Sequence, residues 1–356
     1  MYKISIIIPI YNAEKTIKRA IDSILCQKWD GNLIEDIEII LIDDCSSDNS
    51  KTIIDAYSEE YSNIKVYSTE YNTGFPAKPR NIGIEKSNGK YIMFMDNDDK
   101  YCKDMCQTLF ECISQKNVDV VVCNFFHKFL NHEIVKIKSE LNVKYFLNQQ
   151  DTILLDSYNS ILFNDILPWN KIFDKSKLKK ENIRFPISYP EILLDDRFFF
   201  LEFYSKIDKL IYLKDYYGVI KYTSDQSLSL SPDEKLLIEC IDSALKLQKL
   251  ADSYVDFNKN PKYRYKFINE VIDNFVYKLT LLTNGDKLYF CLKKMHDFEE
   301  EISFDNSITG LNKLINFFIL RNYLYSTIFL IKLVQIFRKS KNLRIIVNKF
   351  YNLIRK

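Results

Sequence analysis

The stretch ISIIIPIYNAEKTIKRAIDSIL, residues 4–25, begins as an apolar run and continues as a helical repeat. Ile4–Ile10 is almost wholly apolar, as expected of a strand buried on both faces of a parallel sheet. After Asn12, which we take as the helix cap, apolar residues recur at spacings of three and four: Ile17, Ala20, Ile21, Ile24 and Leu25. The stretch therefore predicts a strand followed by an amphipathic helix.

Four further runs resemble this first strand. They are Ile37–Ile42, Ile64–Tyr67, Tyr91–Met95 and Val118–Cys123. Because strands and helical patterns alternate, residues 1–125 are predicted to form a Rossmann-like, doubly wound α/β unit with a mostly parallel sheet. Three polar clusters each follow a strand directly: Pro9–Asn12, Asp43–Asp48 and Asp96–Asp99. The topology would bring them to one edge of the sheet, where such folds bind ligands.

The composition is that of a globular protein larger than one average domain, with 356 residues, 47% of them hydrophobic. We expect a main domain over 1–230, whose second half, 126–230, is irregular and aromatic, and a helical C-terminal region over 231–356. The eight cysteines form no CxxC pair and the three histidines complete no zinc pattern. The thiols are expected to be reduced, and the opening run Ile4–Ile10 is too short and wrongly flanked for a signal peptide, so we expect a cytoplasmic protein.

Glycine-rich phosphate loops are not found in the sequence. It contains neither GxGxxG nor GxxxxGK[ST], and only seven glycines in all. A nucleic-acid partner is also disfavoured, because the basic residues of 1–230 are mixed with acidic ones and no recognised motif occurs. Any phosphate bound here must therefore be held by a metal ion and by cationic side chains.

The segment 75–99, FPAKPRNIGIEKSNGKYIMFMDNDD, combines such cations with clustered acids. Asp96, Asp98 and Asp99 repel one another, and a divalent cation would offset that repulsion. Lys78 and Arg80 lie in what we expect to be a proline-stiffened loop, where they could bind phosphate oxygens. Together they predict a pyrophosphate held between this loop and a metal ion on Asp98.

Two other acidic pairs stand out. Asp43 and Asp44 end a strand, where a carboxylate could accept a hydrogen bond from a pyrimidine N3–H while Tyr11 stacks on the base; the alternative is a simple helix-capping turn. Asp195 and Asp196 lie between apolar residues in YPEILLDDRFFF, 189–200. Desolvation there would raise the proton affinity of a carboxylate and suit it to general-base work; the alternative is an ordinary acidic helix start.

At these residues the sequence resembles the family 2 glycosyltransferases with the GT-A fold, over roughly residues 1–230. The similarity is carried by SIIIPIYNAEKTIKRAIDSILCQ, IEIILIDDCSSDNS, NTGFPAKPRNIGIEKSNGKYIMFMDNDD and LLDDRFFF. The resemblance implies that the nucleoside is surrounded by Pro9, Tyr11, Glu14 and Asp44. It further implies that Lys78 and Arg80 lie near the diphosphate, that Asp96 and Asp98 are the DxD pair holding Mn²⁺ or Mg²⁺, and that Asp196 is the catalytic base.

The stretches PAKPRN and PWNKIFDKSKLKKENIRFP resemble enzymes that glycosylate teichoic acid or capsular polysaccharides. This implies an inverting transfer from a nucleotide sugar, usually a UDP-sugar, to a hydroxyl of a polysaccharide, polyol-phosphate or lipid-linked glycan. Two positions depart from the family pattern, Asp195 where Glu is common and Lys221 where many relatives carry Arg. The competing interpretation is a catalytically silent nucleotide-sugar-binding subunit, which retention of both the DxD pair and the base disfavours.

The tail 311–356 carries ten Lys or Arg residues and no Asp or Glu, a formal side-chain charge of +10. Its longest uncharged run, Asn322–Ile331, is too short to cross a bilayer, which takes about 20 residues. We therefore expect this tail to lie on an anionic membrane surface, at the inner face of the cell membrane. The alternative is a basic helical hairpin that packs on the catalytic domain or forms a homo-oligomer interface.

Overall fold

The computed structural model describes residues 1–129, 132–138, 152–154, 165–188 and 194–222, and scattered residues between 243 and 254. The chain divides into two compact units. One comprises Met1–Ser188 and Asp195–Asp225, and the other Tyr189–Leu194 and Gln226–Lys356. Nearly all of the predicted helical region 231–356, including the basic tail 311–356, lies outside the described residues.

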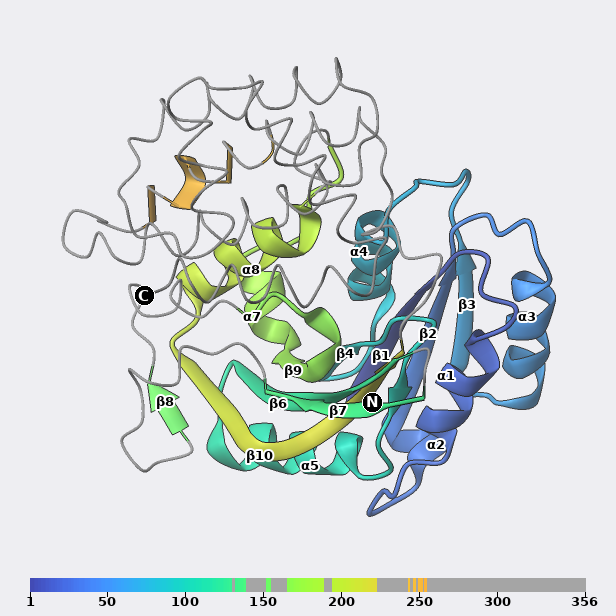
Figure 1. The fold of residues 1–356 in the computed structure, drawn as a ribbon, viewed down its shortest axis with the longest axis horizontal. Helices are drawn as coiled ribbons and strands as arrows, with labels where there is room; N and C mark the ends of the chain where they lie inside the picture. Colours follow the sequence, from blue (N-terminus) through green and yellow to red (C-terminus); the bar gives the residue numbers. More distant parts are fainter. Residues whose placement is uncertain are drawn as a thin grey trace, which may run out of the picture. The chain divides into compact units, whose positions relative to one another are not determined.

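The first unit is built on one curled sheet (Figure 1). Its strand order is β3-β2-β1-β4-β9-β6-β10-β5, with β7 paired to β6 and β8 to β10. The strands are β1 (Ile4–Ile10), β2 (Ile37–Asp43), β3 (Ile64–Ser68), β4 (Tyr91–Phe94), β5 (Lys100–Tyr101), β6 (Val120–Lys128), β7 (Ile134–Ile137), β8 (Thr152–Leu154), β9 (Lys171–Asp174) and β10 (Lys209–Tyr222). The first four are mutually parallel, and β6 and β10 run in the same direction, whereas β9 lies antiparallel between β4 and β6.

The five predicted apolar runs all form strands of this sheet. Every residue of β1 and β2 is buried, because helices cover both faces. One face packs against α1 (Ile17–Leu25), α3 (Ser50–Glu60) and α5 (Met105–Lys116), and a short α2 (Leu33–Asp36) precedes β2. On the opposite face lie α4 (Ala77–Lys86), α7 (Lys175–Lys180) and α8 (Asp195–Lys206), as Figure 1 shows.

Phenylalanine rings dock α8 onto the sheet. Phe199 contacts Phe94 of β4 and Phe173 of β9, with ring centroids 6.4 and 6.3 Å apart, and stacks on Phe185 at 4.0 Å. These residues are fully or almost fully buried. Aromatic burial of this extent fixes the helix that begins with Asp195 and Asp196.

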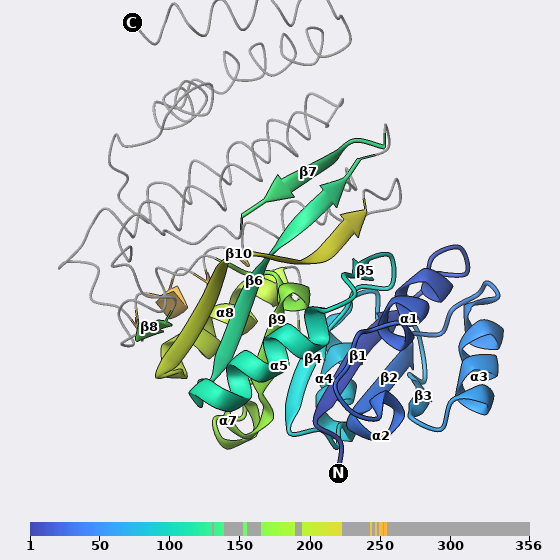
Figure 2. The ribbon, with the colours of Figure 1, turned by 90° about the horizontal axis from the view of Figure 1, so that it is seen from below.

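The prediction that 126–230 is irregular is wrong for its described part. β9, α7, α8 and the 14-residue β10 complete the sheet, and β10 runs beside β6 through two register shifts. Figure 2 shows β6 continuing into a hairpin with β7 next to the end of β10. The run of β-branched and aromatic residues in LIYLKDYYGVIKY was the available signal for this strand.

Two local predictions also need correction. Asn12 does not cap α1, which begins at Ile17; it adopts a left-handed conformation (φ 47°) and its side chain accepts from the Ser47 N–H. Lys78 and Arg80 lie in α4 and not in a loop, because Pro79 falls in the first helical turn, where its missing N–H costs little. Gly83 lets α4 approach β1, since a Cβ there would lie 2.2 Å from Ile7.

The described cysteines are free thiols, with Cys106 and Cys123 buried. Among the helices that the structure describes, none combines the length and the apolar character that crossing a bilayer requires.

Candidate active site

The three predicted polar clusters meet at one edge of the sheet, because β1 pairs in parallel with both β2 and β4. The Asn97 side chain donates to the Pro9 carbonyl at 3.0 Å, which joins the clusters after β4 and β1. The Glu14 N–H donates to Asp48 at 3.0 Å, which joins those after β1 and β2. The loops that the sequence placed together therefore contact one another directly.

The residues predicted to surround a nucleoside have different surroundings. Tyr11 is 45% exposed, so its ring is open for stacking. Glu14 accepts hydrogen bonds from the backbone and side chain of Asn49, the residue before α3, and so supports the start of that helix. Pro9 is buried within β1 and offers its carbonyl to Asn97.

Asp44 is buried and organises the following loop. It accepts from the Thr69 hydroxyl at 2.8 Å and from both the N–H and the hydroxyl of Thr73, at 3.0 and 2.8 Å. Asp43 is buried as well and accepts from the Ser46 N–H at 3.3 Å. Both acids therefore order the turns that follow β2, and the contact of a carboxylate with a base stays a prediction.

Lys78 projects from the first turn of α4 toward Tyr71. Its Nζ lies 4.6 Å from the centre of the Tyr71 ring, and Tyr71 is 60% exposed. Tyr71 was not predicted as a site residue, and its position beside Lys78 makes it a candidate contact for a donor.

Arg80 joins the two acidic motifs. Its guanidinium lies 3.0 Å from Asp96 of the acidic loop, 2.7 Å from Asp196 and 3.7 Å from Asp195 at the start of α8. The arginine is 3% exposed, and the charges of these carboxylates raise its pKa against the opposing effect of burial. Arg80 therefore links the predicted metal-binding loop to the predicted catalytic base.

The two carboxyls of α8 differ in accessibility. The Asp196 side chain is 32% exposed and the Asp195 side chain 14%. Burial, followed by the charge of Asp196, raises the pKa of Asp195 to about 8, which keeps that group largely protonated at neutral pH. Burial also raises the pKa of Asp196, but the ion pair with Arg80 opposes the rise. Asp196 is thus the more accessible of the two carboxyls.

The acidic loop is held from two sides by residues that sequence reasoning missed. Arg19 of α1 donates to the Asp98 carbonyl, and the Tyr222 N–H at the end of β10 donates to the Asp99 carboxylate at 3.0 Å. The Arg19 guanidinium also lies 3.8 Å from the centre of the Tyr222 ring. These contacts connect the start and the end of the first unit at the acidic loop.

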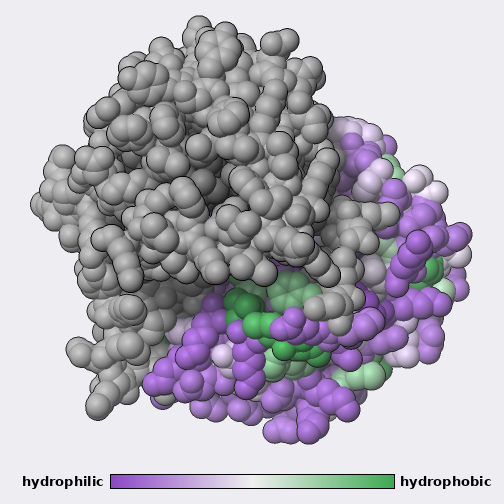
Figure 3. All heavy atoms as spheres, viewed as in Figure 1, coloured by the Kyte–Doolittle hydropathy of each residue, from purple (hydrophilic) through white to green (hydrophobic). Residues whose placement is uncertain are grey.

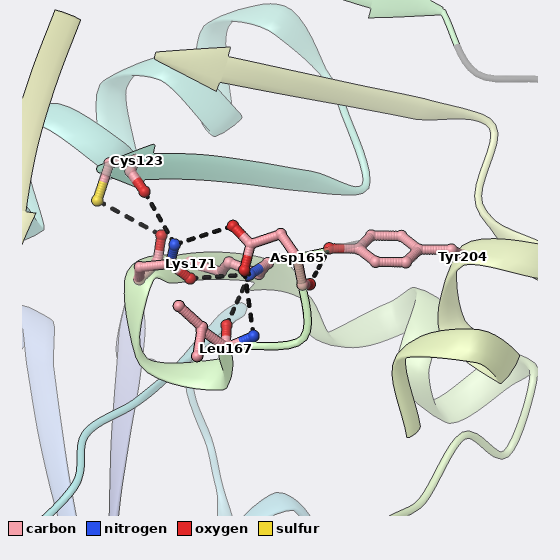
Figure 4. Close-up of polar contacts among 6 residues, drawn as sticks. Cys123, Asp165, Leu167, Lys171 and Tyr204 are labelled. Atoms are coloured by element: carbon pink, nitrogen blue, oxygen red, sulfur yellow. Dashed lines mark hydrogen bonds and ion pairs between the residues drawn. The ribbon is translucent and has the colours of Figure 1, made fainter. Parts of the chain in front are cut away.

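A buried ion pair lies behind α8 (Figure 4). Lys171 donates to Asp165 at 2.7 Å, to the Leu167 carbonyl at 2.6 Å and to Asn170 at 2.8 Å, and both charged side chains are fully buried. Tyr204 of α8 donates to the Asp165 carbonyl at 2.9 Å. Nothing in the sequence pointed to this pair, because a lysine in a short run such as PWNKIFD is usually exposed at the surface. Only the fold shows that Asp165 lies beside Lys171.

Removing one member of this pair should destabilise the protein strongly. We expect Lys171→Met to lower the free energy of unfolding by about 3–5 kcal/mol, because it leaves the Asp165 charge buried and uncompensated. Asp165→Asn/Lys171→Met should recover most of that loss. Urea unfolding of the three proteins checks this, and a double variant no more stable than Lys171→Met would contradict it.

The acidic loop fits a hard divalent cation. Mg²⁺ and Mn²⁺ take carboxylate oxygens, and a site of this kind uses one or two carboxylates together with phosphate oxygens of the substrate. Burial and the charge of Asp96 raise the pKa of Asp98 and so disfavour its ionised form. A bound cation would offset both effects. Within the described residues, no group of three His, Cys, Asp or Glu side chains forms a self-contained metal site. Any cation at Asp96 and Asp98 would therefore need the donor to complete its coordination.

Comparison with known proteins identifies the class. The model of glycosyl transferase family 2 matches residues 5–180. A glycosyltransferase of Haemophilus influenzae is 31% identical over 208 residues, covering 58% of this chain and 74% of that protein. The chain belongs to glycosyl transferase family 2 and is a glycosyltransferase, as the resemblance implied.

Two further similarities are to a curated glucosyltransferase and to a solved structure. The poly(ribitol-phosphate) beta-glucosyltransferase of Bacillus spizizenii is 31% identical over 258 residues, which cover 70% of this chain but only 38% of that protein's length. The crystal structure of Staphylococcus aureus TarS 1–349 in complex with UDP has a TM-score of 0.64 at 19% identity, covering 93% of this chain and 90% of that chain. The latter shows that the mixed α/β fold is shared.

Proposed function

We propose that this chain transfers a sugar, with inversion, from a UDP-sugar to a hydroxyl group of a teichoic-acid-like polymer. The observation that carries the proposal is the convergence of Asp96, Asp195 and Asp196 on the buried Arg80. It joins the donor side of the site to Asp196, the more exposed carboxyl of the α8 pair. The nature of donor and acceptor is supported by the relatives, one named for poly(ribitol-phosphate) and one crystallised with UDP.

The reaction is a single displacement. Asp196 accepts the proton of the acceptor hydroxyl as its oxygen forms a bond to the anomeric carbon, and the bond to the UDP oxygen breaks on the opposite side. One base and one displacement invert the anomeric configuration. Lys78 would contact the diphosphate, and the charge of Arg80 favours the ionised form of Asp196. A cation on Asp96 and Asp98 would neutralise charge on the departing diphosphate.

A panel of nucleotide sugars tests this function. Release of the nucleotide is measured with each donor, with and without poly(ribitol phosphate), in the presence of Mn²⁺. We expect the acceptor to stimulate release from a UDP-sugar and to become glycosylated. Donor-specific binding without turnover of any donor would instead favour a silent binding subunit.

The metal requirement is tested at the acidic loop. We expect Asp98→Ala, and likewise EDTA, to lower donor turnover on the order of 10²-fold or more, because the charge of the leaving diphosphate is then uncompensated. Asp96→Ala should behave similarly, while Asp104→Ala, beyond the loop and paired with Tyr216, is the control. Full turnover in EDTA would refute the role of the metal.

We also propose that the enzyme works at the inner face of the cell membrane, held there by the basic tail 311–356. The charge pattern of the tail is what supports this location.

A further inference from the structure

Cationic and aromatic side chains alternate at the carboxyl end of β6 and on the paired parts of β7 and β10. We call Phe126, Lys128, Lys136, Tyr217 and Tyr222 the cation–aromatic strip. Phe126 and Lys128 point to one face of β6 because they are two residues apart. The register pairs Phe126 with Lys136 of β7, and Lys128 with Tyr222 of β10, which places all four on that face. Tyr217 joins them through its ring, 5.1 Å from that of Phe126.

Each lysine of the strip rests on an aromatic ring. The Lys128 Nζ lies 5.3 Å from the centre of the Tyr222 ring, and the Lys136 Nζ lies 5.2 Å from that of Tyr217. Neither ammonium is ion-paired with a carboxylate within the described residues. Both therefore keep hydrogen-bond donors available for an anionic ligand.

The surroundings of the strip favour an anion. Residues 120–138 contain three lysines and Glu133 as the only acid, and the end of β10, 216–222, contains Lys221 and no acid. Figure 3 shows apolar surface over β6 and β7 bordered by hydrophilic side chains. Ile134 of β7 and Phe129, directly after β6, are 54% and 38% exposed. A ligand that fits must combine negative charge with carbon-rich segments.

The strip leads into the active site. The Lys128 ammonium and the Arg19 guanidinium both contact the Tyr222 ring. Arg19 also donates to the Asp98 carbonyl. The Tyr222 N–H donates to Asp99 of the same acidic loop. A chain lying on the strip would therefore arrive at the loop that we assign to the donor.

We propose that the cation–aromatic strip binds a phosphodiester-linked polyol chain, the acceptor polymer, outside the reaction site. Lys128 and Lys136 pair with successive phosphates, and the rings of Phe126, Tyr217 and Tyr222 cover the polyol carbons. The inference rests on the acceptor class given under the proposed function. In this proposal the strip recognises the polymer, and other residues carry out the transfer.

The test removes the two charges and keeps the fold. In Lys128→Gln/Lys136→Gln we expect the Kd for poly(ribitol phosphate) at low salt to rise about five- to tenfold, because two surface ion pairs are lost. The difference should vanish at ~1 M salt, where such pairs are screened. Hydrolysis of the UDP-sugar without acceptor should be unchanged. The matched control is Lys116→Gln/Lys180→Gln, which removes two exposed lysines from the ends of α5 and α7.

Equal polymer affinity in the strip variant and the wild type, with thermal unfolding confirming that both are folded, would overturn the proposal. So would a variant that binds the polymer normally but loses binding to phosphatidylglycerol vesicles, because the strip would then serve a membrane surface. Failure of the proposed function itself would look different: the wild type would neither hydrolyse a UDP-sugar nor glycosylate the polymer.

Discussion

Asp196→Asn retains donor binding but transfers sugar on the order of 10²–10⁴-fold more slowly, the expected loss when a general base is removed. The amide keeps the size of the side chain and its contact with Arg80 but cannot accept the proton of the acceptor hydroxyl. The measurement is the rate of glycosylation at saturating donor, together with the donor Kd. A rate close to that of the wild type would exclude Asp196 as the base.

Asp195→Asn is the matched control on the same turn of α8. Asp195 is less exposed, and its raised pKa of about 8 already keeps it mostly protonated at neutral pH. We therefore expect its amide variant to transfer within about tenfold of the wild-type rate, well short of the loss of a base. If Asp195→Asn is inactive and Asp196→Asn is not, the roles of the two carboxyls are reversed.

Arg80→Met is expected to affect both the fold and the activity. The Asp96 and Asp196 carboxylates contact this buried guanidinium, and removing it leaves their charges partly uncompensated. Loss of one partner of a buried ion pair costs about 3–5 kcal/mol, so the free energy of unfolding should fall by that amount. Transfer should also be lost, because Asp196 would then bind its proton more tightly.

Two further variants make the Arg80 measurement specific. Lys78→Met changes a partly exposed residue two positions earlier in α4, so its stability should stay within about 0.5 kcal/mol of the wild type. Arg80→Lys keeps the charge but loses the planar fork, and should fall between the wild type and Arg80→Met. Urea unfolding of all four proteins checks this order, and equal losses in Lys78→Met and Arg80→Met would contradict it.

Strands buried on both faces were predictable because apolar residues dominate their sequences. The predicted Ile4–Ile10 is β1 without change, and Ile37–Ile42 differs from β2 by a single residue. The strand β10 was missed because it is half-exposed along much of its length and carries Lys214, Asp215 and Lys221. Such a strand lacks both the continuous apolar run and the clean alternation on which the prediction depended.

The location of the site was predictable for a similar reason. Parallel strands bring their carboxyl ends to one edge, so the polar clusters after β1, β2 and β4 had to meet there. The pairing of Arg80 with Asp196 was not predictable, because 116 residues separate them and only the docking of α8 on the sheet brings them together. The prolines around Lys78 predicted a loop, but the segment begins helix α4, since proline suits a first helical turn as well as a loop.

The anomeric configuration of the product tests the proposed single displacement most directly. The enzyme would be incubated with a UDP-α-sugar and poly(ribitol phosphate), and the new linkage assigned by NMR from the coupling at the anomeric carbon. One displacement assisted by Asp196 gives a β-linked sugar. An α-linked product would contradict the mechanism, because retention of configuration requires a different sequence of steps from the one that this site is proposed to perform.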